Sequence, residues 1–140
     1  MMKLSTIQSV GSTVGPDRCS PIAERILGYW GFDHGSVKTV RFSSNCVFEF
    51  QQQGIKRFLR FAPEWEQQRE YIEVETQLLT WLVNSGLRVS EPIPTQFGNL
   101  VETVDTELGV FHAVVFTALT GRHLELEELD KSHYREWGRY

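Results

Sequence analysis

Apolar and polar residues alternate along several parts of the chain, and this alternation predicts a sheet. In the segment IKRFLRF (55–61), Leu59 and Phe61 point to one face while Arg60 points to the other. Short connections between such segments favour antiparallel neighbours. Segment 110–119 (VFHAVVFTAL) is apolar on both faces over several residues, so we expect a central strand there. The other predicted strands are 37–42, 46–50 and 99–104.

Three further segments have the spacing and end signals of helices. The first begins after Ser20, a good N-cap, with Pro21 at its first position, and stops near residue 31. The longest covers residues 63–85, and the third begins near Asp130 and is expected to continue to Tyr140. The predicted fold class is therefore α+β: a five-stranded, mostly antiparallel sheet with one long helix packed on it.

Composition divides the chain into three parts and removes several function classes. A length of 140 residues predicts one domain, which we place at 20–121. We expect residues 1–19, which are polar and Gly/Ser-rich, to be a flexible N-terminal arm. Residues 122–140 read as a linker and the start of a helix.

Charge and cysteine usage add limits on partners and location. The net charge is −4, with no basic cluster, so a nucleic acid partner is not expected. No apolar run approaches the roughly 20 residues that span a bilayer, and no secretory signal is present, so we expect no membrane association. The two cysteines are far apart, which favours reduced thiols and a cytoplasmic location. The four histidines lack metal-ligand spacing, so no metal site is expected within the chain.

Two charged residues of opposite sign fall where apolar neighbours predict burial. Arg60 lies between Leu59 and Phe61 on the third strand. Glu75 comes three residues after Ile72 and four before Leu79, on the apolar stripe of the long helix. Buried charges need partners, so an ion pair between strand and helix is one interpretation. The other is that Arg60 is a surface residue of an edge strand and that Glu75 reaches solvent from the border of the stripe.

Several segments, in order, resemble the N-terminal lobe of the aminoglycoside phosphotransferase and choline kinase-like family. ETQLLTWLVNSGLRV resembles that family's glutamate-bearing helix, and FSSNCVFEF its hairpin over the phosphates. RFLRFAP is similar to its nucleotide-contacting strand. EPIPTQFGN and VVFTALTGRHL look like the Pro-rich turn and the hinge strand that follow. The resemblance covers about residues 20 to 140. It implies a protein-kinase-like N-terminal lobe at 20–121, and it implies that residues 122–140 lead to an absent C-terminal lobe.

The resemblance implies a set of cofactor-binding residues. Arg60 matches the cation that contacts the α- and β-phosphates, and Glu75 matches its helix partner. The loop over the phosphates and the hinge, whose backbone groups hold adenine, match Ser43, Ser44, Asn45, Phe116, Thr117, Ala118 and Leu119. Two departures matter: the loop has no glycine, and the cation is an arginine where protein kinases have a lysine.

The function implied is that of the ATP- or GTP-binding lobe of a small-molecule phosphotransferase. With Mg²⁺, the parent protein would transfer the γ-phosphoryl group to a hydroxyl of an acceptor bound by the missing lobe. The family's catalytic and metal-binding residues lie in that lobe, so the chain alone is expected to be inactive, with no catalytic residue of its own. The alternative is a non-enzymatic protein-interaction module built on the same lobe. A homodimer of the fragment, through the hinge strand and the final helix, is also expected.

Overall fold

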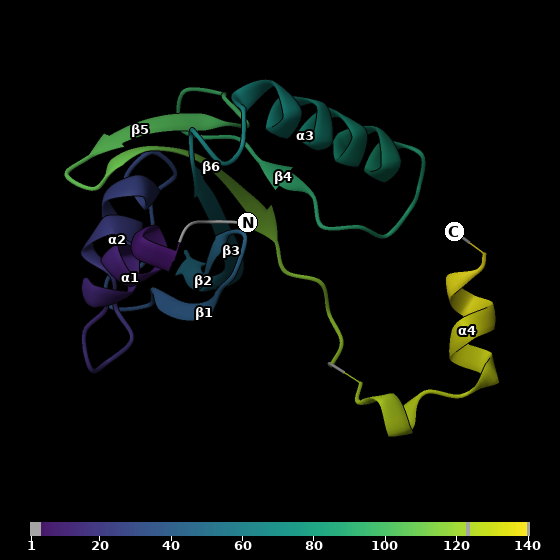
Figure 1. The fold of residues 1–140 in the computed structure, drawn as a ribbon. Coiled ribbons are helices and arrows are strands. Elements are labelled where there is room, and N and C mark those ends of the chain that lie inside the picture. The colour runs from purple at the N-terminus through teal and green to yellow at the C-terminus, as the bar shows by residue number, and fades with distance from the viewer. Residues whose placement is uncertain (1–3, 123, 140) are drawn as a thin grey trace.

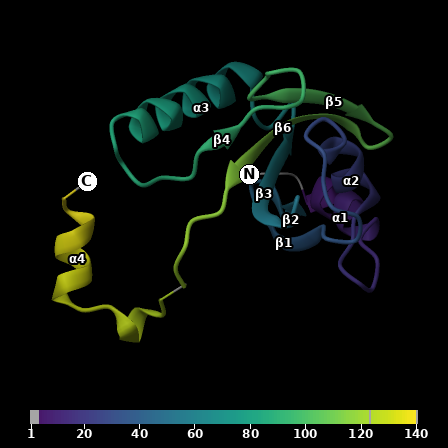
Figure 2. The same ribbon diagram turned by 180° about the vertical axis from the view of Figure 1, so that it is seen from behind.

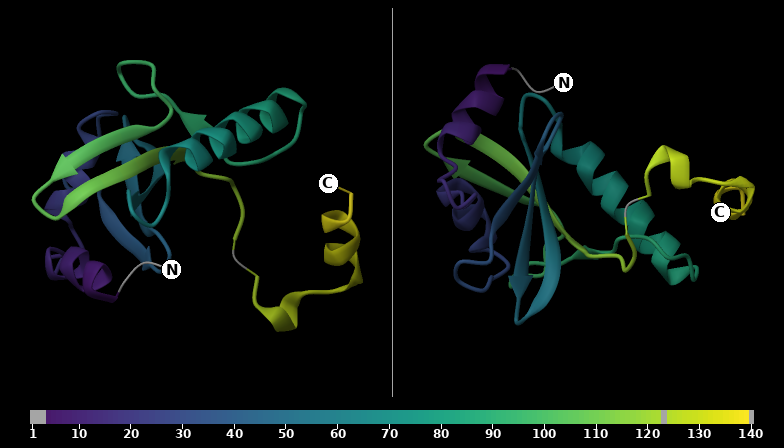
Figure 3. Two further views of the ribbon diagram at one scale, coloured as in Figure 1. Left: turned by 45° about the horizontal axis from the view of Figure 1, so that its top comes forward. Right: turned by 90° about the horizontal axis from the view of Figure 1, so that it is seen from below.

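The computed structural model describes residues 4–122 and 124–139, and it is built in three layers (Figure 1). A sheet forms the middle layer. Helices α1 (Leu4–Ser12) and α2 (Pro21–Leu27) cover one face, and α3 (Arg69–Asn84) covers the other, as the view in the right panel of Figure 3 shows. The predicted α+β class is confirmed. None of the helices in the described part of the chain has both the length and the apolarity that a membrane crossing requires.

The sheet has six strands, one more than predicted. In sheet order β1, β2, β3, β6 and β4 are neighbours, and β5 also pairs with β6, every pair being antiparallel. Strand β6 is therefore central, as its apolar sequence predicts. The strands are β1 (Lys38–Phe42), β2 (Cys46–Gln52), β3 (Ile55–Pro63), β4 (Pro92–Ile93), β5 (Glu102–Thr106) and β6 (Gly109–Thr117).

Register divides the side chains of the sheet between the two helical layers. Phe48 of β2 lies opposite Leu59 of β3, and both are fully buried in the core beneath α1 and α2. Phe61 belongs to the same core and stacks on Phe48, with ring centroids 5.7 Å apart. The side chains at the neighbouring, alternate positions of these strands face α3 instead. The smaller core on that side consists of Ile72, Val101, Val114 and Phe116, with Leu79 packed against it.

The predicted flexible arm contains a helix. Val10 of α1 is fully buried in the core with α2, so this segment is held by packing. The sequence signal is weak because the segment is rich in serine, threonine and glycine, whereas burial of Val10 and Thr6 holds it in place. Residues 1–3 of the predicted arm lie outside the described residues, and the division of the chain into three parts stays a prediction.

The long helix begins later than predicted. Strand β3 continues through Pro63, which pairs with Phe111, and a turn follows before α3 starts at Arg69. Pairing with β6 thus outweighs the helix-start signal of the proline. The helix ends at Asn84, and Gly86 adopts a φ of 85° just beyond it, a left-handed conformation that commonly ends a helix.

Helices α2 and α4 begin where the sequence predicts, but both end earlier than predicted. Ser20 caps α2 by accepting a hydrogen bond from the Ala23 amide, but α2 stops at Leu27. Asp130 caps α4 (Lys131–Trp137), after a short 3-10 helix at Leu126–Glu128. Helix α4 ends at Trp137 with Gly138 as its C-cap, so the predicted continuation is wrong, and Tyr140 lies outside the described residues. Figures 1 and 2 show α4 away from the sheet, at the end of an extended segment.

Candidate functional site

Arg60 and Glu75 form the predicted ion pair. The guanidinium binds the carboxylate through two parallel hydrogen bonds, Nη1 to Oε1 at 2.8 Å and Nη2 to Oε2 at 2.5 Å. The side chains are 22% and 38% exposed, so the pair is partly shielded from water. The surface interpretation of the two charges is therefore wrong. This two-pronged geometry fixes the orientation of the guanidinium as well as its position.

Strand and helix periodicity together bring the pair into contact. Arg60 lies in the middle of the sheet, opposite Val47 of β2 and Val114 of β6, on the face that carries α3. Glu75 follows the buried Ile72 by one helical turn, so it points to the same face from above. The cation is thus mounted on the most completely paired part of the sheet, and its rotamer is held from the helix.

A hollow of about 280 Å³ lies beside the ion pair, between the sheet and α3. The Arg60 guanidinium carbon lies 5.0 Å from the Phe116 ring centroid, which places the cation against an aromatic wall. Lys56 lies over the ring of Phe58, another lining residue, 5.3 Å from its centroid. The hollow combines apolar walls with one oriented cation. Its lining consists of Val47, Phe58, Arg60, Glu75, Leu79, Ser90 and Phe116.

The structure brings only part of the predicted hinge to this hollow. Phe116 lines it, and Thr117 ends β6 beside it. The Thr117 amide donates to the Glu91 carbonyl at 2.9 Å, and the Glu91 amide donates to the Thr117 hydroxyl, so both groups of Thr117 hold the neighbouring segment. Ala118 follows the strand. Leu119 lines a different hollow, of about 360 Å³, with Leu82, Leu87, Arg88, Val89 and Thr120.

The predicted phosphate-covering loop connects β1 to β2 and does not line the hollow. It is a tight turn in which the Ser43 amide donates to the Asn45 carbonyl at 3.1 Å. The Asn45 side-chain amide reaches Ser44 Oγ at 3.5 Å. The Asn45 side-chain oxygen is buried and has no hydrogen-bond partner within the described residues. An unpaired buried acceptor is costly, so this atom has capacity for a donor.

Sequence reasoning missed four residues that line the hollow: Val47, Phe58, Leu79 and Ser90. None carries a chemical signature, because three are apolar and the fourth is a lone serine. Position alone could have identified Phe58, two residues before Arg60 on the same face of β3, and Leu79, one turn after Glu75. Val47 could be found only once its register opposite Arg60 was known.

Two titratable groups near the sheet are structural. Burial lowers the pKa of His112, and the nearby Arg69 cation lowers it further. Its Nδ1 lies 3.0 Å from Thr103 Oγ1, which in turn accepts from Arg69 Nη1 at 2.7 Å. This chain of contacts favours a neutral ring that accepts from Thr103. Burial also raises the pKa of the Cys46 thiol to about 12, so the thiol stays protonated at neutral pH.

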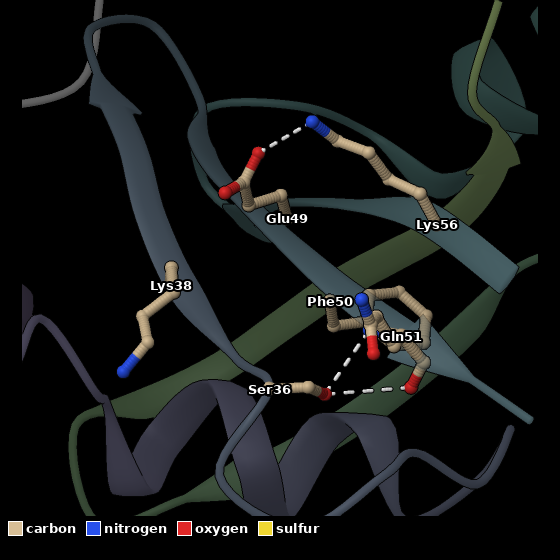
Figure 4. A pocket seen from close by; sticks show the side chains of 6 residues that line it. All are labelled: Ser36, Lys38, Glu49, Phe50, Gln51 and Lys56. Carbon is tan, nitrogen blue, oxygen red and sulfur yellow. Dashed lines mark hydrogen bonds and ion pairs between the residues drawn. The ribbon is translucent and has the colours of Figure 1, made fainter. Parts of the chain in front are cut away.

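A separate polar hollow of about 340 Å³ lies over the first three strands (Figure 4). Lys56 turns toward Glu49 in this view and forms an ion pair at 2.9 Å, whereas Lys38 points away and donates to the Asp17 carbonyl. Ser36 Oγ donates to Asp33 and accepts from the Gln51 amide. Because these polar groups already bind one another, we regard the hollow as structural. Across residues 4–122 and 124–139, no three His, Cys, Asp or Glu side chains are grouped to hold a metal ion.

Comparison with known proteins finds small-molecule kinases. Amicoumacin kinase of Bacillus subtilis (strain 168) is 26% identical over 120 residues, which cover 85% of this chain and 35% of the kinase. The structure of amicoumacin kinase hAmiN in complex with AMP-PNP, Ca²⁺ and Ami superposes with a TM-score of 0.70 at 20% identity, over 86% of this chain and 36% of that one. A microcompartment-associated aminopropanol kinase gives 0.68 at 24% identity, over 84% and 37%.

These likenesses confirm the predicted resemblance to small-molecule kinases and the kinase-like fold. The chain spans about a third of the length of the relatives that it matches. No protein-family profile matches it.

Proposed function

We propose that this chain, which has the fold of the N-terminal part of small-molecule kinases, is the nucleotide-binding lobe of such a kinase. The observation that carries the proposal is the two-pronged Arg60–Glu75 pair at the edge of an apolar hollow. A fixed guanidinium is suited to phosphate oxygens, and the aromatic wall of Phe116 is suited to a purine ring. Among the similar structures, one kinase was solved with the ATP analogue AMP-PNP and Ca²⁺, which supports a nucleotide with a divalent cation.

Each predicted site residue has a role in this proposal. Arg60 binds the α- and β-phosphates, and Glu75 holds its guanidinium in place. The loop of Ser43, Ser44 and Asn45 covers the phosphates with its hydroxyl and amide N–H donors, because the buried Asn45 carbonyl oxygen can only accept hydrogen bonds. The backbone of the hinge, residues 116–119, binds the base. The nucleotide is ATP or GTP, and it brings Mg²⁺ with it.

The hollow is smaller than a complete nucleotide site. Ligand sites usually enclose about 300–1,000 Å³, whereas the hollow beside Arg60 encloses about 280 Å³. We infer that this chain supplies one wall of the site. The remaining wall, the catalytic groups and the site for a small-molecule acceptor would come from the rest of the kinase, since the matched part is only about a third of the relatives' length.

We expect no phosphotransferase activity from the 140 residues alone. Transfer to a hydroxyl requires a group that orients the hydroxyl and ligands that hold the metal against the phosphates. No metal-ligand cluster occurs in the described part of the chain. We further propose a cytoplasmic location for the kinase, because Cys19 and Cys46 are free thiols.

Calorimetric titration of the chain with AMP-PNP and Mg²⁺ tests the proposal. Arg60→Ala should weaken binding about 10- to 100-fold, since a hydrogen bond to a charged group contributes about 1.5–3 kcal/mol. Arg60→Lys should recover part of the affinity, because it keeps the charge and loses the fork. Arg25→Ala is the matched control. This variant breaks another Arg–Glu pair, in which Arg25 of α2, on the opposite face of the sheet, binds Glu107.

Equal binding by the Arg60→Ala and Arg25→Ala variants would overturn the assignment of Arg60. An unaltered chain with no affinity for nucleotide would favour the alternative, a protein-interaction module built on the same fold. One observation speaks for that alternative: the outer side of α3 carries an exposed apolar stripe.

A further inference from the structure

The outer side of α3 carries four large exposed apolar side chains in one line: Tyr71, Val74, Leu78 and Trp81. Each is between 54% and 68% exposed, although the opposite side of the same helix is buried through Ile72 and Thr76. Their spacing of three, four and three residues is that of the a and d positions of a coiled coil. The stripe extends about 15 Å along the helix, at 1.5 Å per residue.

The proposed nucleotide site does not account for this stripe. The hollow beside Arg60 lies under α3, whereas the stripe points away from the sheet on the far side of the helix, the side that is uncovered in Figures 1 and 3. Single exposed apolar residues are ordinary, but a continuous apolar helix face with polar borders indicates an interaction surface.

We propose that the stripe, residues 71, 74, 78 and 81, binds the same stripe of a second copy of this chain, with the two α3 helices antiparallel. If the two-fold axis passes midway between Val74 and Leu78 on the outer side of the helix, Tyr71 lies opposite Trp81 of the second copy, and Val74 lies opposite Leu78 of the second copy. Every member of the stripe thereby meets an apolar partner. The spacing is self-complementary, as an interface with two-fold symmetry requires.

Charge selects the antiparallel direction. Glu70 borders the stripe near the N-terminal end of α3, so a parallel pair would place two Glu70 carboxylates side by side. In the antiparallel pair they are separated by about 18 Å along the axis, from the rise of 1.5 Å per residue. Glu70 then lies near the uncharged Asn84 of the second copy, and the helix dipoles oppose each other favourably. Glu75 borders the other side of the stripe, but Arg60 of its own copy already neutralises it.

The size of the surface predicts a weak dimer. A fully buried aromatic side chain removes about 150–250 Å² from water, so Tyr71 and Trp81, about two thirds exposed, offer less than that each. Two copies of the stripe then bury several hundred Å², below the roughly 1,200 Å² of a standard stable interface. We therefore expect dimerisation that depends strongly on protein concentration.

Sedimentation equilibrium of the 140-residue chain over a concentration series tests the proposal. The unaltered chain should move from the mass of one chain toward twice that mass. Val74→Glu and Leu78→Lys should each weaken dimerisation at least about tenfold, because each would bury an unpaired charge in the contact. Ile55→Glu is the matched control, since Ile55 is an equally exposed apolar residue on β3, away from the stripe.

Mixing the two variants tests the direction of the helices. In an antiparallel pair, the glutamate introduced at 74 in one chain faces the lysine introduced at 78 in the other. The unaltered Leu78 of the first chain then faces the unaltered Val74 of the second. The mixture should therefore form a heterodimer that neither variant forms with itself. A parallel pair offers no such match, and an unrescued mixture would overturn the antiparallel register.

Other outcomes would reject the α3 surface. A chain that stays monomeric at the highest concentration, or a dimer that survives Val74→Glu, would overturn the proposal. Loss of the dimer in Trp137→Ala, with Val74→Glu unaffected, would place the contact at the hinge and final helix instead. Far-UV circular dichroism checks that each variant is folded. Nucleotide titration of the same variants tests the nucleotide site separately from dimerisation. Failure of the dimer proposal therefore leaves the proposed function standing, and failure of the proposed function leaves the dimer proposal standing.

Discussion

Two arginine–glutamate pairs of this molecule should differ measurably in strength, and the comparison tests our description of the site. Arg60 and Glu75 share two hydrogen bonds and are mostly shielded, whereas Arg25 and Glu107 share one contact of 3.0 Å and are mostly exposed. A double-mutant cycle with alanine at each position measures the coupling free energy of each pair.

The expected magnitudes follow from geometry and exposure. Shielded hydrogen bonds between charged groups contribute about 1.5–3 kcal/mol. Partial exposure of Glu75 reduces this, so we expect a coupling of about 1 kcal/mol for the inner pair and about 0–0.5 kcal/mol for the outer one. With an m-value of about 2 kcal/mol/M, a coupling of 1 kcal/mol corresponds to about 0.5 M in the urea midpoint, well above experimental error.

Urea unfolding, followed by tryptophan fluorescence, would supply the seven free energies needed for the two cycles, which share the unaltered chain. A coupling for Arg60 and Glu75 that does not exceed the coupling for Arg25 and Glu107 would refute the reasoning. It would mean that the inner pair is held apart in solution, or that water screens it as fully as it screens the outer pair. Raised salt provides a second check, since it should reduce the outer coupling proportionally more.

Three further predictions concern the core, the thiols and the last helix. Phe61→Ala should lower the free energy of unfolding by about 3–5 kcal/mol in urea titration, because Phe61 contacts the rings of Phe48 and Phe111. The exposed Phe97→Ala should change it by less than about 0.5 kcal/mol. A thiol reagent at pH 8 should modify Cys19 and leave the buried Cys46 intact until the chain unfolds, as mass spectrometry of the labelled peptides would show. The pKa of the capping Asp130 is lowered to about 2, chiefly by the Ser132 side chain. Its stabilisation of α4 should therefore be complete above 3.8, the ordinary pKa of an aspartate, and be lost as pH falls toward 2, visible as reduced helicity that Asp130→Asn no longer shows.

The part of the site that could be predicted from the sequence is the ion pair, because its two charged residues lie at positions that the apolar pattern predicts to be buried. Arg60 interrupts an apolar strand segment and Glu75 interrupts an apolar helix stripe, and each anomaly is readable without a structure. Their contact confirms the inference. Of the walls of the hollow, Val47 was not predictable, because it differs in no way from an ordinary strand residue until register places it opposite Arg60.

The parts of the fold that were missed depend on distant partners. Strand β4 has two residues, Pro92 and Ile93, which pair with Phe116 and Val115 far along the chain. The prolines at positions 92 and 94 indicate a break in regular structure, and only pairing with the edge of β6 makes this segment a strand. Helix α1 was missed for the same reason, since a polar segment was fixed by burial of Val10. In both places tertiary contact outweighed local preference.

The central place of β6 has a consequence for the order in which the chain can fold. Strand β6 pairs with β3 along one edge and with both β4 and β5 along the other, yet it is the last of the six strands of this sheet to be synthesised. Until residue 117 has left the ribosome, β3 presents an open edge, and β4 and β5 have no neighbour. Open edges recruit other chains. The nascent chain therefore carries its greatest risk of aggregation just before it acquires the strand that joins the two halves of the sheet and completes the wall beside Arg60.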